Sequence, residues 1–394
     1  MQKLKILYLT TEDSTFWSHR LALAQAAREE GAEVVIMTRY GSHSKRLETD
    51  GFRVIPWRIS RRSLNPFREI RSFIDVLLAY RRERPDLVHH IALKPIVFGS
   101  IASRLCGKIP TVNTVTGLGP IFTKDSFLFT AVRVLLKRLL TLSFRATNCK
   151  VIAQNQDDRK VLCGFGLVDI EKTAVITGFG IDTDEFCSLP EQPGDDIVTL
   201  PARMVWEKGI REFVEASKEL KRRGVAARMV LAGEPDERNR GCIPKAQLER
   251  WSDSGTVEWW GQRGDMTAVL RQSRVVCLPS YCEGLPRTLV EAAACARAIV
   301  TTDVPGCSTV VRHGINGLLV PARDPIALAD AIQVLLRDNK RRLAMGSAGR
   351  EIAVREFSLE KILYATMGVY NQLLDGKWTF DRESCEQLKV TAKT

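Results

Sequence analysis

Short apolar runs alternate with helix-length segments along most of this 394-residue chain. The runs are apolar on both faces, which is typical of buried strands in parallel sheets, where a helix crosses over between one strand and the next. The pattern predicts strands at Ile6–Thr10, Val34–Thr38, Val54–Trp57, Leu87–His90, Val112–Val115, Val151–Ala153, Ala174–Ile176, Ile197–Leu200, Met229–Ala232, Val257–Trp260, Val275–Leu278, Ile299–Thr302 and Leu318–Val320. We therefore expect an α/β fold built on doubly wound parallel sheets.

A linker interrupts this alternation. Residues 188–196, SLPEQPGDD, have the proline, glycine and acid content of a domain boundary, and the chain is too long for one ordinary core. We expect an N-terminal Rossmann-like domain over residues 1–190 and a second one over residues 191–357. A helix over residues 358–376 and a polar tail over residues 377–394 complete the expected organisation.

The stretch from Pro279 to Glu291, PSYCEGLPRTLVE, follows the predicted strand Val275–Leu278. Glu283 lies in its loop, Pro286 stands where a helix should begin, and residues Arg287 to Ala296 are expected to be helical, with Glu291 one turn inside. A helix N-terminus attracts phosphate, and ionised carboxylates accept hydrogen bonds from sugar hydroxyls. The stretch suits a ligand that is part phosphate and part sugar, although a solvated loop with two surface glutamates explains it equally well.

Two cations, Arg203 and Lys208, follow the first strand of the second half and flank a loop that leads into a helix. Arginine binds phosphate bidentately and lysine acts as a point charge, so the pair suits a diphosphate. A solvated pair of surface cations is the alternative. The expected strand order favours the ligand site, because it places this loop and the loop of Glu283 at the same edge of the sheet.

The formal net charge of +12 favours anionic partners: a nucleic acid, an acidic lipid surface or a phosphorylated substrate. Arginines crowd the segment from Arg58 to Arg84, and four cations of the stretch Phe127–Arg145 fall within an arc of about 140° on an otherwise mostly apolar helix. Such a helix packs into the protein with a charged outer stripe, or it lies on a membrane with its cations at anionic head groups. A nucleic-acid surface is less favoured, because aromatic residues do not interleave with the basic ones.

Several features bear on compartment and cofactor. Ten cysteines without a C-x-x-C pair fit a reducing cytoplasm better than a disulfide framework or a zinc site. The N-terminal apolar run is too short for a signal peptide, and no uncharged apolar stretch of about 18 residues is present. The dinucleotide fingerprint G-x-G-x-x-G after the first strand is missing, which disfavours an NAD enzyme. We expect a cytoplasmic protein.

Polar residues of the first half also follow predicted strands. His89 and His90 end one strand and precede Lys94, and His19 lies near the start of the first helix. Gly117 belongs to a glycine-rich loop after another strand. Open α/β sheets bind ligands at the ends of their strands, so these residues are candidates for a binding site, although a histidine is more often structural than catalytic.

The second half resembles glycosyltransferase family 4, a family of retaining enzymes with the GT-B fold. The matching motifs are Arg203-x-x-x-x-Lys208-Gly209, Leu231-Ala-Gly233, Pro279-Ser-x-x-Glu283-Gly-Leu-Pro-Arg, Glu291 eight residues after Glu283, and Asn316-Gly317. The first half resembles a narrower group of that family, bacterial enzymes that extend undecaprenyl-diphosphate-linked glycans, such as the lipid-linked N-acetylgalactosaminyltransferases. Its marks are Ser18-His19-Arg20, His89-His90-x-x-x-Lys94-Pro95, Val115-Thr-Gly117-Leu-Gly119 and Gln154-Asn155-x-x-Asp158.

The resemblance implies a GT-B fold with two Rossmann-like domains that face a central cleft, and a C-terminal helix that crosses back to the first domain. The catalytic residues it implies are Glu283, Arg203, Lys208 and His90. The donor-binding residues are Arg203 and Lys208 for the diphosphate, Glu291 for the ribose hydroxyls, and the backbone of Gly284, Leu285 and Pro286. The acceptor-binding residues are His19, His90, Lys94 and Gly117. No metal and no cofactor are implied.

The implied activity is transfer of a hexose or N-acetylhexosamine, with retention, from a nucleotide sugar to a polyprenyl-diphosphate-linked saccharide in bacterial surface polysaccharide or glycan biosynthesis. A UDP-sugar is the favoured donor. The enzyme is expected at the anionic inner face of the cell membrane as a peripheral protein, with no nucleic acid as partner. Two alternatives stay open: a nucleotide-sugar 2-epimerase of the same fold, and a non-enzymatic basic protein that binds lipid or nucleic acid. The sequence departs from the family at Cys282, where arginine is common, and at Phe179, where a small residue is usual.

Overall fold

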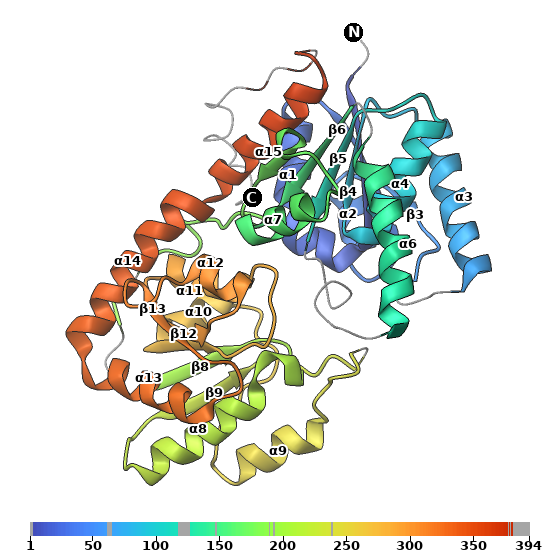
Figure 1. The fold of residues 1–394 in the computed structure, drawn as a ribbon. Coiled ribbons are helices and arrows are strands. Elements are labelled where there is room, and N and C mark those ends of the chain that lie inside the picture. Colours follow the sequence, from blue (N-terminus) through green and yellow to red (C-terminus); the bar gives the residue numbers. More distant parts are fainter. Residues whose placement is uncertain are drawn as a thin grey trace. The chain divides into compact units, whose positions relative to one another are not determined.

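The computed structural model describes residues 3–60, 65–116, 127–145, 148–188, 190–191, 194–237, 239–376, 378 and 380. The chain forms two compact units, residues 1–180 together with 360–394, and residues 181–359. Each unit has its own parallel sheet with helices on both faces (Figure 1). The prediction of two doubly wound parallel-sheet domains is therefore confirmed.

The first unit is built on a seven-stranded sheet in the order β3-β2-β1-β4-β5-β6-β7. Its strands are β1 (Lys5–Glu12), β2 (Glu33–Arg39), β3 (Arg53–Pro56), β4 (Leu87–Ile91), β5 (Thr111–Val115), β6 (Cys149–Ala153) and β7 (Thr173–Val175). Its helices are α1 (Asp13–Glu29), α2 (Ser44–Thr49), α3 (Pro66–Glu83), α4 (Leu93–Leu105), α6 (Phe127–Phe144), α7 (Gln156–Gly164) and α15 (Leu359–Leu373). The strand order reverses between β1 and β4, so the loops after these two strands form the switch point of this sheet.

The second unit is built on a six-stranded sheet in the order β10-β9-β8-β11-β12-β13. Its strands are β8 (Ile197–Pro201), β9 (Arg228–Ala232), β10 (Glu258–Trp259), β11 (Val275–Leu278), β12 (Ala298–Thr302) and β13 (Gly317–Val320). Its helices are α8 (Ile210–Arg222), α9 (Lys245–Asp253), α10 (Met266–Gln272), α11 (Arg287–Ala294), α12 (Pro305–Val310), α13 (Pro325–Arg337) and α14 (Asn339–Phe357). The reversal lies between β8 and β11, which makes the loops after them the switch point.

The boundary between the units falls earlier than the linker composition indicated. Residues 181–190, which we assigned to the first domain, belong to the second unit. The backbone N–H of Ile181 donates to the carbonyl oxygen of Phe357 at 2.9 Å, and Ile181 and Phe186 are buried in the core of the second unit. Apolar side chains ahead of the linker thus fix the boundary, because their burial ties them to this core.

Helix α15 packs on the first unit through buried polar contacts. The Tyr370 hydroxyl lies 2.6 Å from His89 Nδ1 and 3.3 Å from the Tyr8 hydroxyl. On the other side of the ring, His89 Nε2 lies 2.7 Å from Thr114 Oγ1. Burial lowers the pKa of His89 well below its ordinary value. His89 is therefore a neutral structural residue that connects the sheet to the C-terminal helix.

The cationic segment Phe127–Arg145 forms α6. Leu140 and Phe144 are buried in a core cluster, whereas Arg138 and Arg145 are exposed. This helix thus has a packed face, and its exposed side carries these cations together with Val134 and Leu142, which are 47% and 46% exposed. Within the described residues, no helix combines the length and the apolar content that a membrane span requires.

Glu191 joins the beginning of the second unit to α14 through buried ion pairs. Its carboxylate accepts hydrogen bonds from Arg342 at 2.9 and 2.7 Å and from Arg274 at 2.5 Å. The side chain of Arg342 is only 2% exposed. We expect Glu191→Gln to lower the free energy of unfolding of this unit by about 3 kcal/mol, because removing one partner leaves a buried charge without its pair.

The same contacts predict how this stabilisation depends on pH. Burial alone raises the pKa of Glu191, but the hydrogen bonds from Arg342 and Arg274 outweigh it, so the pKa lies below its ordinary value of 4.5. A carboxyl with a lowered pKa stabilises the fold fully above its ordinary value and loses this contribution as the pH falls through the folded-state pKa. Urea unfolding of wild type and Glu191→Gln, followed from about pH 7 to about pH 3, measures both effects. A difference between the two proteins that stays constant over this range would contradict the assignment.

Candidate active site

The switch point of the second sheet brings together the loops that follow β8 and β11. These strands are neighbours, with Val275 beside Val198, and the sheet continues from them in opposite directions. Ligands of doubly wound sheets bind in the crevice at this position. The loop after β8 contains Arg203 and Lys208, and the loop after β11 contains Glu283.

An ion pair between Lys208 and Glu283 joins the two loops. Lys208 Nζ donates to Glu283 Oε1 at 2.5 Å, and the Ser280 hydroxyl donates to the same oxygen at 2.6 Å. The Lys208 side chain is 20% exposed and that of Glu283 is 10% exposed. Partial burial strengthens such a pair relative to one in full solvent, because the surroundings screen it less. The site therefore presents a positioned cation beside a positioned carboxylate.

Arg203 lies in a more open environment. It pairs with the carboxylate of Asp236, which follows β9, and its side chain is 59% exposed. A solvent-exposed arginine exchanges a carboxylate for a phosphate readily, because both groups accept the same pair of parallel hydrogen bonds. Arg203 can thus change partner, whereas Lys208 is fixed by its surroundings.

The N-terminus of α11 follows directly on the Glu283 loop. The helix begins at Arg287, and Pro286 is its N-cap residue with extended backbone (φ −76°, ψ 111°). The helix starts where it was expected and ends two residues earlier, at Ala294, and the Pro286 carbonyl oxygen accepts from the Leu289 N–H at 3.1 Å. In this described region no side chain caps the helix, so its first backbone N–H groups suit an anion.

Glu291 lies one turn inside α11 and is 6% exposed. Its Oε1 accepts from Arg287 Nε at 2.6 Å. Burial raises the pKa of Glu291, and the neighbouring Arg287 guanidinium opposes this shift. A carboxylate has acceptor positions on both oxygens, so Glu291 retains capacity beyond its contact with Arg287.

Glycines allow the loops to approach one another. Gly209 has φ +71°, and a Cβ at this position would lie 2.0 Å from the carbonyl oxygen of Pro279. A Cβ on Gly306 of α12 would lie 2.6 Å from the carbonyl oxygens of both Glu283 and Gly284. A side chain at either position therefore forces the backbone of the Glu283 loop to move.

Gly209→Ala is expected to lower kcat/KM by more than about 100-fold, because it displaces the loop that positions Lys208, and to destabilise the second unit by about 2 kcal/mol. Gly224→Ala is the matched control: its φ is +69°, but a Cβ there meets nothing within 4 Å. Steady-state kinetics and urea unfolding of both variants separate the clash from the backbone strain. Equal losses in the two variants would show that the contact with Pro279 has no special role.

The first unit has its own switch point, after β1 and β4. Ala92, directly after β4, has φ +81° and ψ 164°, a conformation that is otherwise almost confined to glycine. Strained backbone of this kind gathers at binding sites. Two residues later, Lys94 Nζ donates to the carbonyl oxygen of Ser60 and to Glu69 Oε1, both at 2.9 Å. Lys94 is therefore anchored at the beginning of α3.

His90 lies in the core of the first unit. Its side chain is 0% exposed; Nε2 is 2.8 Å from the Tyr80 hydroxyl and Nδ1 is 2.7 Å from Asn113 Oδ1. Burial lowers the pKa of His90 to about 4. Both ring nitrogens are occupied and no ring surface is accessible, so this geometry does not support the expected catalytic and acceptor-binding roles. The physical reason is that β4 is buried on both faces, so that a side chain within the strand points into the protein even near the strand end.

The other expected acceptor residues lie in different settings. His19 is half-buried on α1; its ring packs edge-to-face on Phe179 with 4.5 Å between ring centres, and its Nδ1 lies 2.9 Å from Ser18 Oγ. Gly117 lies outside the described residues. His19 and Lys94 are thus the expected acceptor residues whose side chains reach the surface of the described part of this unit.

Sequence reasoning did not single out Ser280, Asp236 or Ala92. Ser280 lies in the motif around Glu283, and its spacing of three residues from that carboxylate is the signal that could have identified it. Asp236 belongs to an acidic loop after β9, but a partner for Arg203 from another strand becomes visible only in the folded sheet. Within the described residues, no group of three or more His, Cys, Asp or Glu side chains could hold a metal ion.

Two family models match the chain. "Glycosyl transferase 4-like" matches residues 5–155, and "Glycosyl transferases group 1" matches residues 195–338, so each match lies within one unit. Among solved structures, the Anabaena protein Alr3699/HepE in complex with UDP and glucose has a TM-score of 0.75 at 20% identity, covering 93% of this chain and 99% of that one. This likeness establishes the GT-B fold, and the two matches define the protein as a glycosyltransferase.

Two curated relatives are similar to this chain over most of its length. The chain is 29% identical over 369 residues, 89% of its length and 94% of the relative's, to the N,N'-diacetylbacillosaminyl-diphospho-undecaprenol alpha-1,3-N-acetylgalactosaminyltransferase of Campylobacter jejuni. It is 23% identical over 327 residues, 80% and 83% of the two chains, to the UDP-Gal:alpha-D-GlcNAc-diphosphoundecaprenol alpha-1,3-galactosyltransferase of Escherichia coli. The resemblance to family 4 that the motifs indicated is confirmed, and the non-enzymatic alternative is set aside.

Proposed function

We propose that this glycosyltransferase moves a hexose or N-acetylhexosamine from a nucleotide sugar, a UDP-sugar by preference, to a saccharide linked to polyprenyl diphosphate, with retention at the anomeric carbon. The observation that carries the proposal is the ion pair of Lys208 and Glu283 beside the uncapped N-terminus of α11. The names of the two relatives support it, since one names a UDP-galactose donor and both name undecaprenol-linked acceptors.

The donor site follows from these charges. We assign the diphosphate to Lys208, Arg203 and the first N–H groups of α11, and backbone contacts to Gly284, Leu285 and Pro286. As the bond between sugar and diphosphate breaks, negative charge grows on the departing nucleoside diphosphate, and cations positioned in advance stabilise it. This electrostatic role requires no protein nucleophile, and we assign none.

In this proposal Glu283 accepts hydrogen bonds from the transferred sugar, and Glu291 accepts hydrogen bonds from the ribose of the nucleotide. When a phosphate contacts the Lys208 ammonium group, Glu283 regains acceptor capacity for hydroxyls of the transferred sugar. Glu291 accepts hydrogen bonds from the ribose through the capacity that Arg287 leaves. The close packing of the loops around Gly209 holds the cation and the carboxylate in register.

We propose that the first unit binds the acceptor after β1 and β4, with His19, Lys94 and Gly117 as the contacting residues and His90 as a structural residue. The strained backbone at Ala92 supports a binding site here. A cation such as Lys94 suits the diphosphate of a polyprenyl-linked acceptor. This acceptor is held in a membrane, so we place the enzyme in the cytoplasm, peripherally associated with the inner face of the cell membrane, where its net charge of +12 favours anionic lipid. A 2-epimerase would need no such acceptor, and the relatives' transferase names support the transferase.

A thermal-shift series with UDP, GDP, ADP and dTDP tests the donor site. A nucleotide at about 100 times its dissociation constant stabilises the fold by about 2.7 kcal/mol. We expect UDP to raise the melting temperature and the Lys208→Ala variant to lose this response. Stabilisation by GDP alone would reassign the donor, and a protein that responds to none of the nucleotides would contradict the proposed site.

A further inference from the structure

One face of α3 exposes a row of large apolar side chains, here called the α3 stripe. Phe67, Ile70, Ile74 and Leu78 are 82%, 56%, 45% and 56% exposed. At 100° per residue the four positions fall within an arc of about 80°, opposite the face that buries Val76. A contiguous apolar surface on a folded domain marks contact with another body.

Arginines border the α3 stripe on one side. Arg68, Arg71 and Arg82 follow the stripe within the next 80° or so of the helix circumference, and all three are exposed. An exposed Arg81 lies in line with the stripe at its C-terminal end. The helix thus joins an apolar face to a cationic shoulder, which is the pattern of a helix that lies in a membrane interface.

Among the acidic residues of α3, Glu83 offsets one arginine of this shoulder, Arg82, whereas Glu69 and Asp75 pair with neighbouring elements. Glu69 pairs with Lys94 of α4 at 2.9 Å, and Asp75 pairs with Arg58, which follows β3. Glu83, whose side chain is 2% exposed, pairs with Arg53 of β3 at 2.9 Å and with Arg82 at 3.0 Å. Each carboxylate therefore pairs with a cation from a neighbouring element of the first unit, and Glu83 pairs with Arg82 as well.

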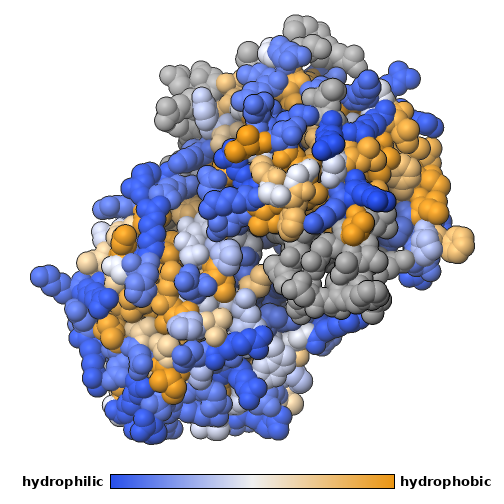
Figure 2. All heavy atoms as spheres, viewed as in Figure 1, coloured by the Kyte–Doolittle hydropathy of each residue, from blue (hydrophilic) through white to orange (hydrophobic). Residues whose placement is uncertain are grey.

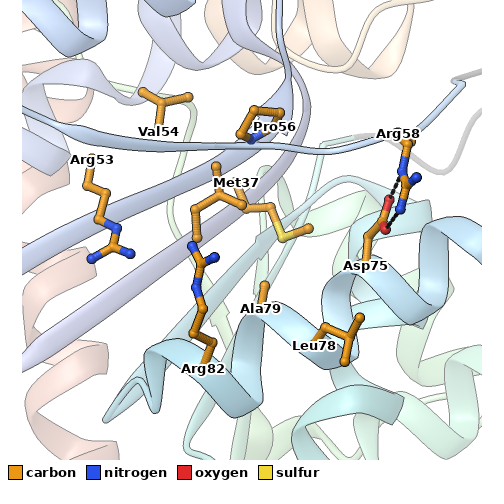
Figure 3. Close-up of a pocket in the computed structure, with 10 residues that line it drawn as sticks. Met37, Arg53, Val54, Pro56, Arg58, Asp75, Leu78, Ala79 and Arg82 are labelled. Atoms are coloured by element: carbon orange, nitrogen blue, oxygen red, sulfur yellow. Dashed lines mark hydrogen bonds and ion pairs between the residues drawn. The ribbon is translucent and has the colours of Figure 1, made fainter.

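A pocket of about 460 Å³ lies beside the C-terminal end of the α3 stripe. Arg53, Arg58 and Arg82 line it, and Leu78 belongs both to this pocket and to the stripe (Figure 3). Their partners Asp75 and Glu83 offset two of the three cations, so the pocket retains one positive charge. An arginine pocket open to solvent suits a phosphate group, because guanidinium groups bind phosphate through parallel hydrogen bonds.

The surface view agrees with this assignment. Hydrophobic residues gather along the right-hand margin of the first unit in Figure 2, where Figure 1 places α3, and hydrophilic residues adjoin them. Apolar and cationic groups are therefore presented on the same side of one unit.

We propose that the α3 stripe and the arginine pocket form the surface by which this protein docks on an anionic lipid bilayer. The apolar side chains enter the interfacial layer, and the arginines contact phosphate head groups. Charge complementarity selects this occupant, because a bilayer offers an apolar layer under a sheet of negative charge. The proposal rests on the proposed function for the location of the acceptor. It assigns the membrane contact to α3, which lies in the arginine-rich stretch of the sequence, whereas the sequence alone indicated a membrane-facing helix in the segment of α6.

Flotation with vesicles tests the docking surface. The variant Ile70→Ser/Ile74→Ser is compared with Leu343→Ser/Val354→Ser, which removes exposed apolar side chains (52% and 43% exposed) from α14 of the other unit. On vesicles of phosphatidylglycerol and phosphatidylcholine, we expect the α3 variant to bind at least about tenfold more weakly than wild type and the α14 variant to bind like wild type. Arg71→Gln/Arg82→Gln is expected to weaken binding to these vesicles, while wild type binds poorly to pure phosphatidylcholine.

A second measurement separates this proposal from the proposed function. With a water-soluble acceptor analogue, the α3 variant is expected to keep wild-type kcat/KM, and with a vesicle-embedded acceptor it is expected to lose activity in parallel with binding. Wild-type vesicle binding by the α3 variant would overturn the docking surface and leave the proposed function standing. Sedimentation without vesicles offers a second contradicting result. If wild type self-associates and the α3 variant does not, the stripe is an interface between copies of this chain, and the docking surface is overturned.

Discussion

Lys208→Ala is expected to lower kcat/KM for the nucleotide sugar by about 10³-fold. Of the two cations assigned to the diphosphate, Lys208 is the more firmly positioned: its side chain is 20% exposed, against 59% for Arg203, and its Nζ lies 2.5 Å from Glu283 Oε1. A fixed charge in a partly buried site stabilises a developing negative charge without reorganising, so its loss affects the transition state more than the bound substrate. The effect should therefore appear in kcat as well as in KM.

This experiment includes one control variant, Lys218→Ala, and one comparison with the other site cation, Arg203→Ala. Lys218→Ala removes a lysine from α8 that pairs with Glu215 at 2.9 Å and is 52% exposed, and we expect it to leave kcat/KM unchanged. Arg203→Ala is expected to lower kcat/KM by about 10²-fold, because its 59% exposed side chain interacts through solvent and already shares its charge with Asp236. A Lys208→Ala variant with wild-type kcat would show that the developing charge is stabilised elsewhere.

Glu283→Ala is the second change with a large expected effect, a loss of about 10²-fold or more in kcat/KM. Glu283 holds Lys208 in place and accepts the Ser280 hydroxyl at 2.6 Å, so its removal frees the cation and leaves a hydroxyl without its partner. Glu215→Ala, an exposed carboxylate paired with Lys218 on α8, is the matched control and is expected to retain wild-type activity.

A double-mutant cycle shows how the two residues act together. If Glu283 acts mainly by positioning Lys208, the double variant Lys208→Ala/Glu283→Ala loses little more activity than Lys208→Ala alone. We expect the double variant to show a combined loss clearly smaller than the sum of the two single losses, expressed as free energies. Strict additivity would mean that the ion pair has no part in catalysis.

The fold could be predicted from the sequence because each buried parallel strand appears as a short run of apolar residues. The runs Val275–Leu278 and Ile197–Leu200 coincide with β11 and with all but the last residue of β8, and the pairing of these strands places Lys208 beside Glu283. The glycine at position 209 belongs to the same motif, and its close approach to Pro279 explains why a loop of this sequence adopts this course. At this site the sequence motif and the packing of the two loops therefore lead to the same prediction.

The first unit could be predicted less well, for a physical reason. A strand that is apolar on both faces gives no alternation, so the sequence does not show that His90 points into the core. The α3 stripe was hidden in a similar way: its arginines were visible, but whether Ile70 and Ile74 face the core or the solvent depends on what packs against the helix. The exposed face of a helix is a property of the fold rather than of its composition.

The most direct test of the proposed activity is a transfer assay with a synthetic polyprenyl-diphosphate-linked saccharide and a series of radiolabelled UDP-hexoses and UDP-N-acetylhexosamines. We predict that label from one of these donors moves to the lipid-linked acceptor, that NMR of the product shows the anomeric configuration of the donor, and that Lys208→Ala abolishes most of the transfer. Conversion of the nucleotide sugar to its 2-epimer without acceptor, with no label in the lipid fraction for any donor, would contradict the account and favour the epimerase.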